Sequence, residues 1–184
     1  MCYDVCQEKM ADPDIERWKQ YGIISAWHYV DFPKNYCGYH LTADSDGCAF
    51  LLGLFERFRS ASFPARKLLT LSPPSQQMLA VPNCHVSHVS MRNIEFRSLR
   101  DYSPEHWAVT ASDGKISIEV GCTRLADLEK GIHDILNGDG DWPLGSERDS
   151  LWFWWRPQTK RAEQDRAHQS TFCPESKFSD DSNL

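Results

Sequence analysis

Residues 115–136, KISIEVGCTRLADLEKGIHDIL, carry the strongest periodic pattern in this chain of 184 residues. KISIEV alternates polar and apolar side chains, which predicts a strand with one buried face. The following residues repeat apolar side chains at helical spacing, with Thr123 as the expected N-cap and Asn137-Gly138 as the stop signal. The predicted apolar stripe of the helix is Leu125, Leu128, Ile132, Ile135 and Leu136.

The same order of elements occurs earlier in the chain. Strand-like runs at 23–32 and 36–43 are joined by a turn, and DSDG at 44–47 marks the start of an amphipathic helix. A third strand is expected at 65–71. In the later block, HWAVT and KISIEV flank Asp113-Gly114, a strong hairpin signal, and LWFWW at 151–155 predicts an interior strand with large rings on both faces.

These patterns predict an α+β fold, with a mixed or antiparallel sheet, two main helices packed on one face, and two ββαβ units. We expect a leader with a short helix at 1–22, a single domain at 23–156 and a flexible polar tail at 157–184. The halves of the domain would be 23–73 and 105–156, joined by 74–104. Within that joining segment, MLAV at 78–81 and VSHVSMRNIEF at 86–96 are each expected to be a strand.

Charge is uneven along the chain. The formal net charge is -6, and residues 105–150 alone hold ten acidic and four basic side chains. Phosphate would be repelled there, so we expect no nucleic-acid partner. No run approaches the roughly 18 apolar residues of a membrane span, and the N-terminus shows no signal peptide. With seven scattered cysteines, these features predict a cytoplasmic protein with free thiols. The oligomeric state cannot be read from the sequence.

The sequence offers few candidates for catalysis or metal binding. Cys48 lies at a predicted helix start, with His28 and His40 on neighbouring strands, so a Cys–His pair is conceivable. The spacing of GDGD at 138–141 fits neither a phosphate loop nor a calcium loop. A zinc set is also conceivable, although its spacing is irregular: Cys2, Cys6, Cys84, His85 and His88. We therefore expect a non-catalytic protein without cofactor or metal.

The acidic turn after the later helix is the best candidate for a binding site. Its carboxylates surround an aromatic ring, a combination that attracts a basic protein partner by charge and anchors it by buried area. The predicted partner-binding residues are Asp134, Asp139, Asp141, Trp142, Glu147 and Asp149. This predicts an inhibitor or immunity-type protein. The alternatives are a small hydrolase-like enzyme that uses these carboxylates or Cys48, and a domain that joins a larger assembly through residues 72–104.

Overall fold

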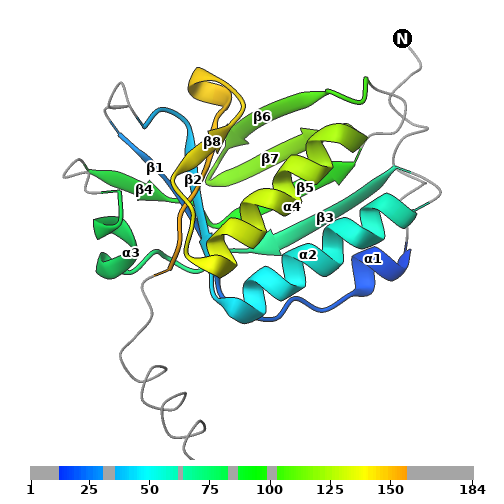
Figure 1. Ribbon diagram of the computed structural model, residues 1–184, viewed down its shortest axis with the longest axis horizontal. Helices are drawn as coiled ribbons and strands as arrows, with labels where there is room; N and C mark the ends of the chain where they lie inside the picture. The colour runs from blue at the N-terminus through cyan, green and yellow to red at the C-terminus, as the bar shows by residue number, and fades with distance from the viewer. Residues whose placement is uncertain (1–12, 31–35, 62–63, 83–86, 99–102, 157–184) are drawn as a thin grey trace, which may run out of the picture.

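The computed structural model describes residues 13–30, 36–61, 64–82, 87–98 and 103–156. Its strands form two sheets, and two long helices lie side by side (Figure 1). The predicted α+β class with two main helices is therefore confirmed, although the strands divide between two sheets. The helices are α1 (Pro13–Arg17), α2 (Ser45–Ser60), α3 (Gln76–Ala80) and α4 (Cys122–Asn137).

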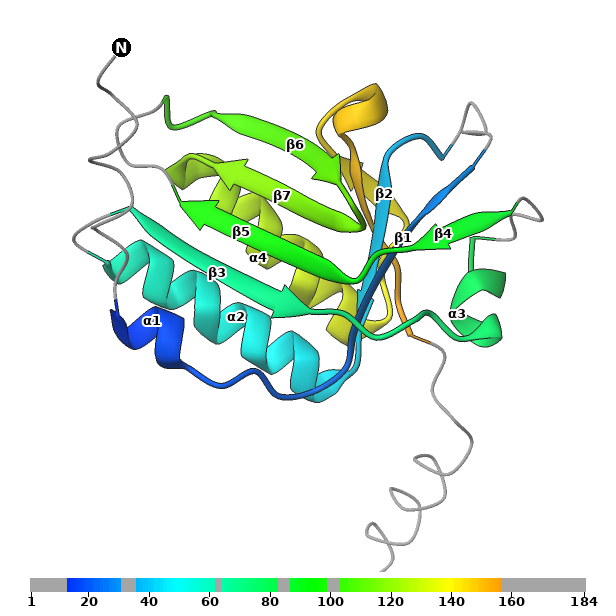
Figure 2. The same ribbon diagram turned by 180° about the vertical axis from the view of Figure 1, so that it is seen from behind.

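The four-stranded sheet provides the surface on which the long helices pack. Its parallel pair, β5 and β7, lies in the middle, and the outer pairings are antiparallel. Buried side chains such as Phe96 and Ile118 point towards the helices, and the Phe96 ring lies 5.2 Å from that of Phe55 in α2. No described helix covers the other face (Figure 2). In spatial order the strands are β3 (Ala65–Thr70), β5 (Asn93–Ser98), β7 (Lys115–Val120) and β6 (Trp107–Ser112).

The five-stranded sheet has apolar side chains on both faces. Leu41, Leu151 and Phe153 point into the main core shared with both long helices. Trp27 and Trp154 belong to a second cluster on the opposite face, so the prediction of large rings on both sides of the 151–155 strand is confirmed. In spatial order the strands are β4 (His88–Ser90), β1 (Ile24–Tyr29), β2 (Tyr39–Ala43), β9 (Leu151–Phe153) and β8 (Trp142–Leu144).

The two halves of the chain exchange strands between the sheets. The early hairpin β1-β2 belongs to the five-stranded sheet, but after α2 the chain contributes β3 and β5 to the four-stranded sheet. The later hairpin β6-β7 belongs to the four-stranded sheet, but after α4 the chain contributes β8 and β9 to the five-stranded sheet. Parallel pairs β2-β9 and β5-β7 join the halves. Strand β4, which lies between β3 and β5 in the chain, returns to pair with β1 in the five-stranded sheet. The second half is therefore ββαββ, the first half has three strands after its long helix, and each sheet needs strands from both halves.

The two long helices begin in different ways. The Asp44 side chain accepts a hydrogen bond from the Gly47 amide at 2.7 Å, as an N-cap does. In α4 the expected Thr123 cap is wrong, because the N-cap residue is Gly121 and the Pro104 carbonyl accepts the Thr123 amide at 3.0 Å. A carbonyl from a distant segment thus takes the role of the side-chain cap. Leu136, predicted to be buried, is 43% exposed at the last turn.

The joining segment also differs from its prediction. Residues 78–81 were expected to form a strand, but α3 occupies Gln76–Ala80, with Ser75 as N-cap accepting from the Met78 amide. The predicted strand at 86–96 is two strands in different sheets. The break falls between Met91, whose amide donates to Ala26 of β1, and Arg92, whose amide donates to Gly114 beside β7. Neighbouring residues with backbone partners in different sheets cannot continue one strand.

Candidate functional site

The predicted acidic turn is a loop that leads from α4 into β9, and we call residues 138–149 the acidic loop. Gly138 ends α4 in the left-handed conformation, and β8 and a short 3-10 helix, Glu147–Asp149, follow. The chain then enters β9. The loop is therefore held at both ends by elements of the core, and its side chains are presented at the edge of the five-stranded sheet.

Trp142 packs against the protein itself. Its indole N–H donates to the Asp134 carboxylate at 2.8 Å, and its ring centroid lies 5.0 Å from that of Phe153. The Lys130 ammonium lies over the ring at 4.6 Å. The ring is half-buried, in contrast to the exposed anchor that the sequence suggested. The place of Trp142 and Asp134 in a partner surface stays a prediction.

Asp134 stabilises the packing of Trp142. Burial alone would raise the pKa of its carboxyl group, but hydrogen bonds from Lys130 and Trp142 and the charge of Lys130 hold the pKa below its usual range. Lys130 Nζ lies 2.6 Å from the carboxylate. Asp134 is therefore compensated within the protein, and its charge is not free for a partner.

The other four carboxylates of the predicted site carry uncompensated charge. All are exposed, and none has an ion pair within the described part of the chain. Most acidic residues elsewhere in the described ranges have basic partners; for example, Glu129 pairs with Arg59, and Glu119 pairs with Arg97. Negative charge is therefore concentrated at the acidic loop. The four residues are Asp139, Asp141, Glu147 and Asp149.

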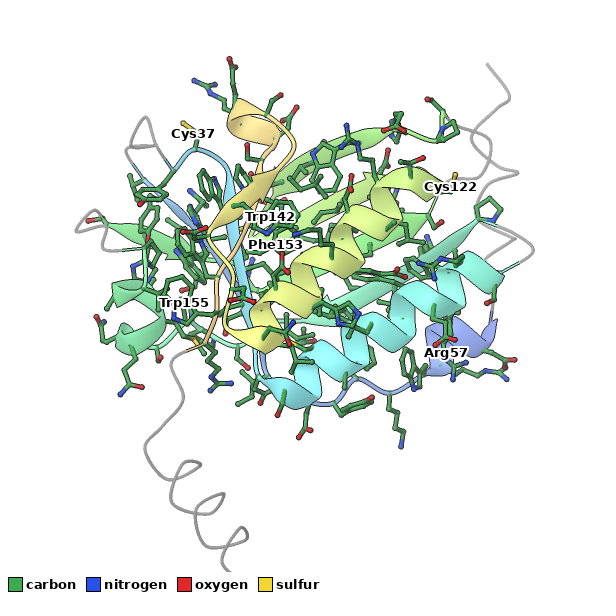
Figure 3. All side chains as sticks on the ribbon, in the orientation of Figure 1. Cys37, Arg57, Cys122, Trp142, Phe153 and Trp155 are labelled. Atoms are coloured by element: carbon green, nitrogen blue, oxygen red, sulfur yellow. The ribbon has the colours of Figure 1, made fainter. Side chains whose placement is uncertain are left out.

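An aromatic pocket adjoins this loop, with a volume of about 400 Å³. It opens on the face of the five-stranded sheet that is opposite to the long helices. Trp155 lies on the α3 side of the molecule, whereas Trp142 and Phe153 lie towards α4 (Figure 3). Of the predicted partner-binding residues, Asp141 lines this pocket. The lining residues are Tyr36, Val81, Pro82, Asp141, Trp152, Trp154 and Trp155.

The rings of the pocket are inclined to one another. Trp152 and Trp154 are parallel to within 12° at 5.8 Å, because residues two apart on a strand point to the same face. Tyr36 is tilted by 60° to Trp154 at 5.7 Å, and Trp155 is tilted by 54° to Trp154 at 6.2 Å. Trp154 is buried, while Tyr36, Trp152 and Trp155 are half-buried. The pocket thus has an aromatic floor and inclined aromatic walls.

His40 supports the floor from within the sheet. It is fully buried, and its ring is stacked on Trp27, Trp152 and Trp154. The Trp154 indole N–H donates to His40 Nδ1 at 2.8 Å, so Nδ1 is the acceptor and Nε2 carries the proton, 3.3 Å from the Tyr36 carbonyl. Burial lowers the pKa of His40 to about 3, against the Tyr36 hydrogen bond, and His28 lowers it further. The imidazole is therefore neutral and structural at neutral pH.

Asp141 joins the pocket to the acidic loop. Its φ of 139° lies in a region that residues other than glycine rarely adopt and that costs about 1–3 kcal/mol. Its carboxylate has no hydrogen bond or ion pair to any residue that the structure describes. The nearby Arg156 instead pairs with Asp44 at 3.4 Å. A free negative charge therefore lies at the rim of an aromatic pocket.

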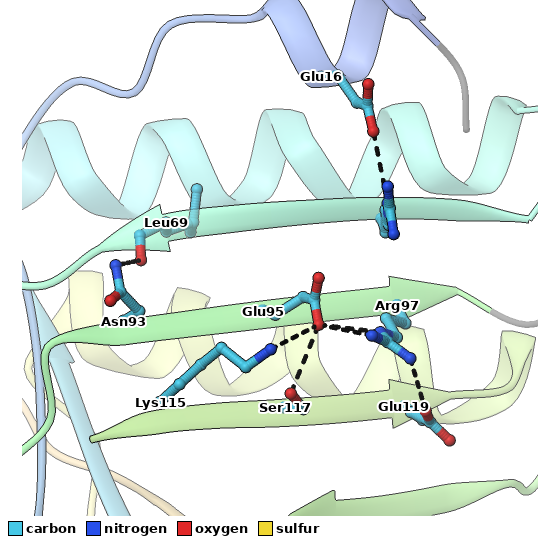
Figure 4. Close-up of polar contacts among 9 residues, drawn as sticks. Glu16, Leu69, Asn93, Glu95, Arg97, Lys115, Ser117 and Glu119 are labelled. Atoms are coloured by element: carbon cyan, nitrogen blue, oxygen red, sulfur yellow. Dashed lines mark hydrogen bonds and ion pairs between the residues drawn. The ribbon is translucent and has the colours of Figure 1, made fainter. Parts of the chain in front are cut away.

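A second polar cluster lies on the uncovered face of the four-stranded sheet (Figure 4). Glu95 is 8% exposed and lies 2.9 Å from the Arg97 guanidinium and 3.4 Å from the Lys115 ammonium. Ser117 Oγ is 3.5 Å from the same carboxylate oxygen. The charges compensate one another, so this cluster stabilises the sheet face. A hollow of about 350 Å³ beside it is lined by Glu16, Arg66, Lys67, Leu68 and Glu95.

Cys48 does not have the surroundings of a nucleophile. Its side chain is fully buried, and burial, with the nearby Asp44 charge, raises its pKa to about 12. It belongs to the main core, whereas His40 points to the opposite face of the five-stranded sheet. The Cys–His pair of Cys48 with His40 that the sequence suggested is therefore wrong. A catalytic thiol needs a lowered pKa and access for substrate.

The described residues contain no group of three or more His, Cys, Asp or Glu side chains arranged to hold a metal ion. Four residues of the conceivable zinc set, Cys2, Cys6, Cys84 and His85, lie outside the described residues. Residues 1–12 of the predicted leader at 1–22 and the whole predicted tail at 157–184 also lie outside them. Within the described ranges, no helix has the length and apolarity to cross a bilayer.

Comparisons with protein-family models, with curated proteins and with solved structures find no match for this chain. Its function is therefore inferred from its own residues and their geometry.

Proposed function

We propose that this chain is a non-catalytic binding protein that captures a basic protein partner through the acidic loop and the aromatic pocket beside it. A small acidic protein of this kind would act as an inhibitor or immunity-type protein, by covering a positively charged surface of its partner. The observation that carries the proposal is the uncompensated charge of four carboxylates in one loop, of which Asp141 lines a pocket with half-buried rings. The four residues are Asp139, Asp141, Glu147 and Asp149.

Charge and rings have separate roles in such a complex. Uncompensated carboxylates attract a basic partner over distances near the Debye length and select against acidic partners. Tyr and Trp rings provide the buried contact area that slows dissociation. Trp142 contributes indirectly, because its packing on Phe153 and its bond to Asp134 hold the loop in place.

The test is affinity capture from native extract with charge-reversed variants. Asp139→Lys/Asp149→Lys changes the net charge by +4 and leaves the pocket lining intact. Asp46→Lys/Glu56→Lys on α2 makes the same change of charge at exposed positions away from the loop. We expect the loop variant to lose a basic partner that the wild type and the α2 variant both retain, and the captured amount to fall with salt. Equal capture by all three proteins would refute the proposal.

A further inference from the structure

The aromatic pocket has the composition of a site for a cation that is weakly hydrated. Three indole rings and one phenol line it, and the side-chain acceptors among its lining residues are the Asp141 carboxylate and the Tyr36 hydroxyl. Ring faces attract cations through their quadrupole, and tryptophan does so most strongly. No described residue supplies a cation to this pocket, since Arg156 pairs with Asp44 and Lys130 lies over Trp142.

The number of acceptors distinguishes between kinds of cation. An unmethylated ammonium brings three N–H donors, and each donor that loses water without gaining an acceptor weakens binding. A quaternary ammonium has no N–H donor, so aromatic faces and a single carboxylate satisfy it fully. The volume of about 400 Å³ lies within the usual range for small-ligand pockets.

We propose that this pocket binds a quaternary ammonium group, presented as a trimethylated lysine of the basic protein partner. The ammonium binds between the inclined faces of Tyr36, Trp154 and Trp155, with Asp141 at the rim. That the lysine belongs to a basic protein rests on the proposed function. The neighbouring charge favours this source over a choline lipid, because the uncompensated carboxylates of Asp141, which lines the pocket, and of Asp139, two residues before it, would repel the phosphate beside a choline.

The first experiment tests the pocket without any partner. Tetramethylammonium chloride is titrated into the full chain, and the indole N–H resonances are followed by NMR, with tert-butanol as an uncharged probe of similar shape. We expect the Trp155 resonance to shift with tetramethylammonium and not with tert-butanol. Asp141→Asn and Trp155→Phe should each weaken binding by about 2- to 30-fold. The matched controls, Glu56→Gln at an exposed position on α2 and Trp18→Phe, whose ring stacks on Phe50 of α2, should leave it unchanged. No shift, or an equal shift with tert-butanol, would overturn the proposal.

The second experiment tests the source of the cation by calorimetry. A basic peptide with one trimethyllysine is compared with the same peptide carrying lysine or the uncharged carbon isostere of trimethyllysine. At least about tenfold tighter binding of the trimethylated form is expected, since two or more ring contacts are gained. Equal binding of the three peptides, or equal competition by phosphatidylcholine vesicles, would overturn the lysine assignment.

The outcomes separate this proposal from the proposed function. If tetramethylammonium binds but Asp139→Lys/Asp149→Lys captures the same partners as wild type, the pocket assignment stands and the basic-partner function fails. If charge reversal abolishes capture and methylation makes no difference, the function stands and the pocket assignment fails.

Discussion

Acidification should destabilise this protein through one histidine. His40 is buried, with a pKa of about 3 in the fold, against a value of 6.5 for an unperturbed side chain. Below pH 6.5 the unfolded chain binds a proton at this position that the folded protein does not bind, so stability is lost as the pH falls from 6.5 to 3. The loss is about 1.4 kcal/mol per pH unit, or about 2 kcal/mol by pH 5, towards a limit of about 5 kcal/mol.

The substitution His40→Phe isolates this effect. The phenyl ring keeps the stacking on Trp27, Trp152 and Trp154 but leaves the Trp154 indole N–H without its acceptor, at a cost of about 1–3 kcal/mol at pH 7.5. The variant has nothing to protonate at this position, so its stability should not show this loss with acid. The wild type and the variant should therefore approach equal stability near pH 5.

Urea unfolding followed by tryptophan fluorescence at pH 7.5, 6.5, 5.5 and 5.0 measures both curves. His133→Asn, at an exposed position on α4, is the control and should keep the slope of the wild type. Parallel curves for wild type and His40→Phe would refute the reasoning, because they would place the lost stability elsewhere.

Two further outcomes are expected. In Gly131→Ala the new methyl group would lie 2.5 Å from the Phe153 ring, so the free energy of unfolding should fall by about 1–3 kcal/mol. Adding Phe153→Leu to this variant should recover part of the lost stability. Additive losses in the double-mutant cycle would contradict the clash. Iodoacetamide labelling with peptide mapping should modify exposed Cys122 in the native protein and spare Cys48 until the protein unfolds, whereas early labelling of Cys48 would contradict its burial.

Local patterns predicted the elements whose signals lie within a few residues. The alternation of KISIEV, the helix start at 44–47 and the Asp113-Gly114 turn all correspond to observed structure, because each depends on neighbours in the chain. The α3 segment was missed because apolar residues at 78–81 do not distinguish a short helix from a strand without the Ser75 cap. The predicted Thr123 cap was wrong because the Pro104 carbonyl, which belongs to another segment, accepts the amide at the start of α4.

The candidate site shows the same division. The acidic residues of the loop and the density of tryptophans at 152–155 are visible in the sequence. The face of the fold on which each of these side chains lies is not visible there. Strand alternation alone would place Trp152 and Trp154 together; it could not bring Tyr36, Val81 and Asp141 to the same pocket. Those residues meet because β9 pairs in parallel with β2 and α3 covers that face.

The sequence by itself determined the α+β class, the two long helices, both hairpins and the concentration of acidic charge after α4, since periodicity and composition are properties of short segments. Only the tertiary structure decided the exchange of strands between two sheets, the neutral His40 beneath the rings, the packing of Trp142 and the free carboxylate at the aromatic pocket. The physical reason is that strand pairing joins residues more than a hundred positions apart, such as His40 and Trp152, and burial of a side chain is set by what lies across that pairing.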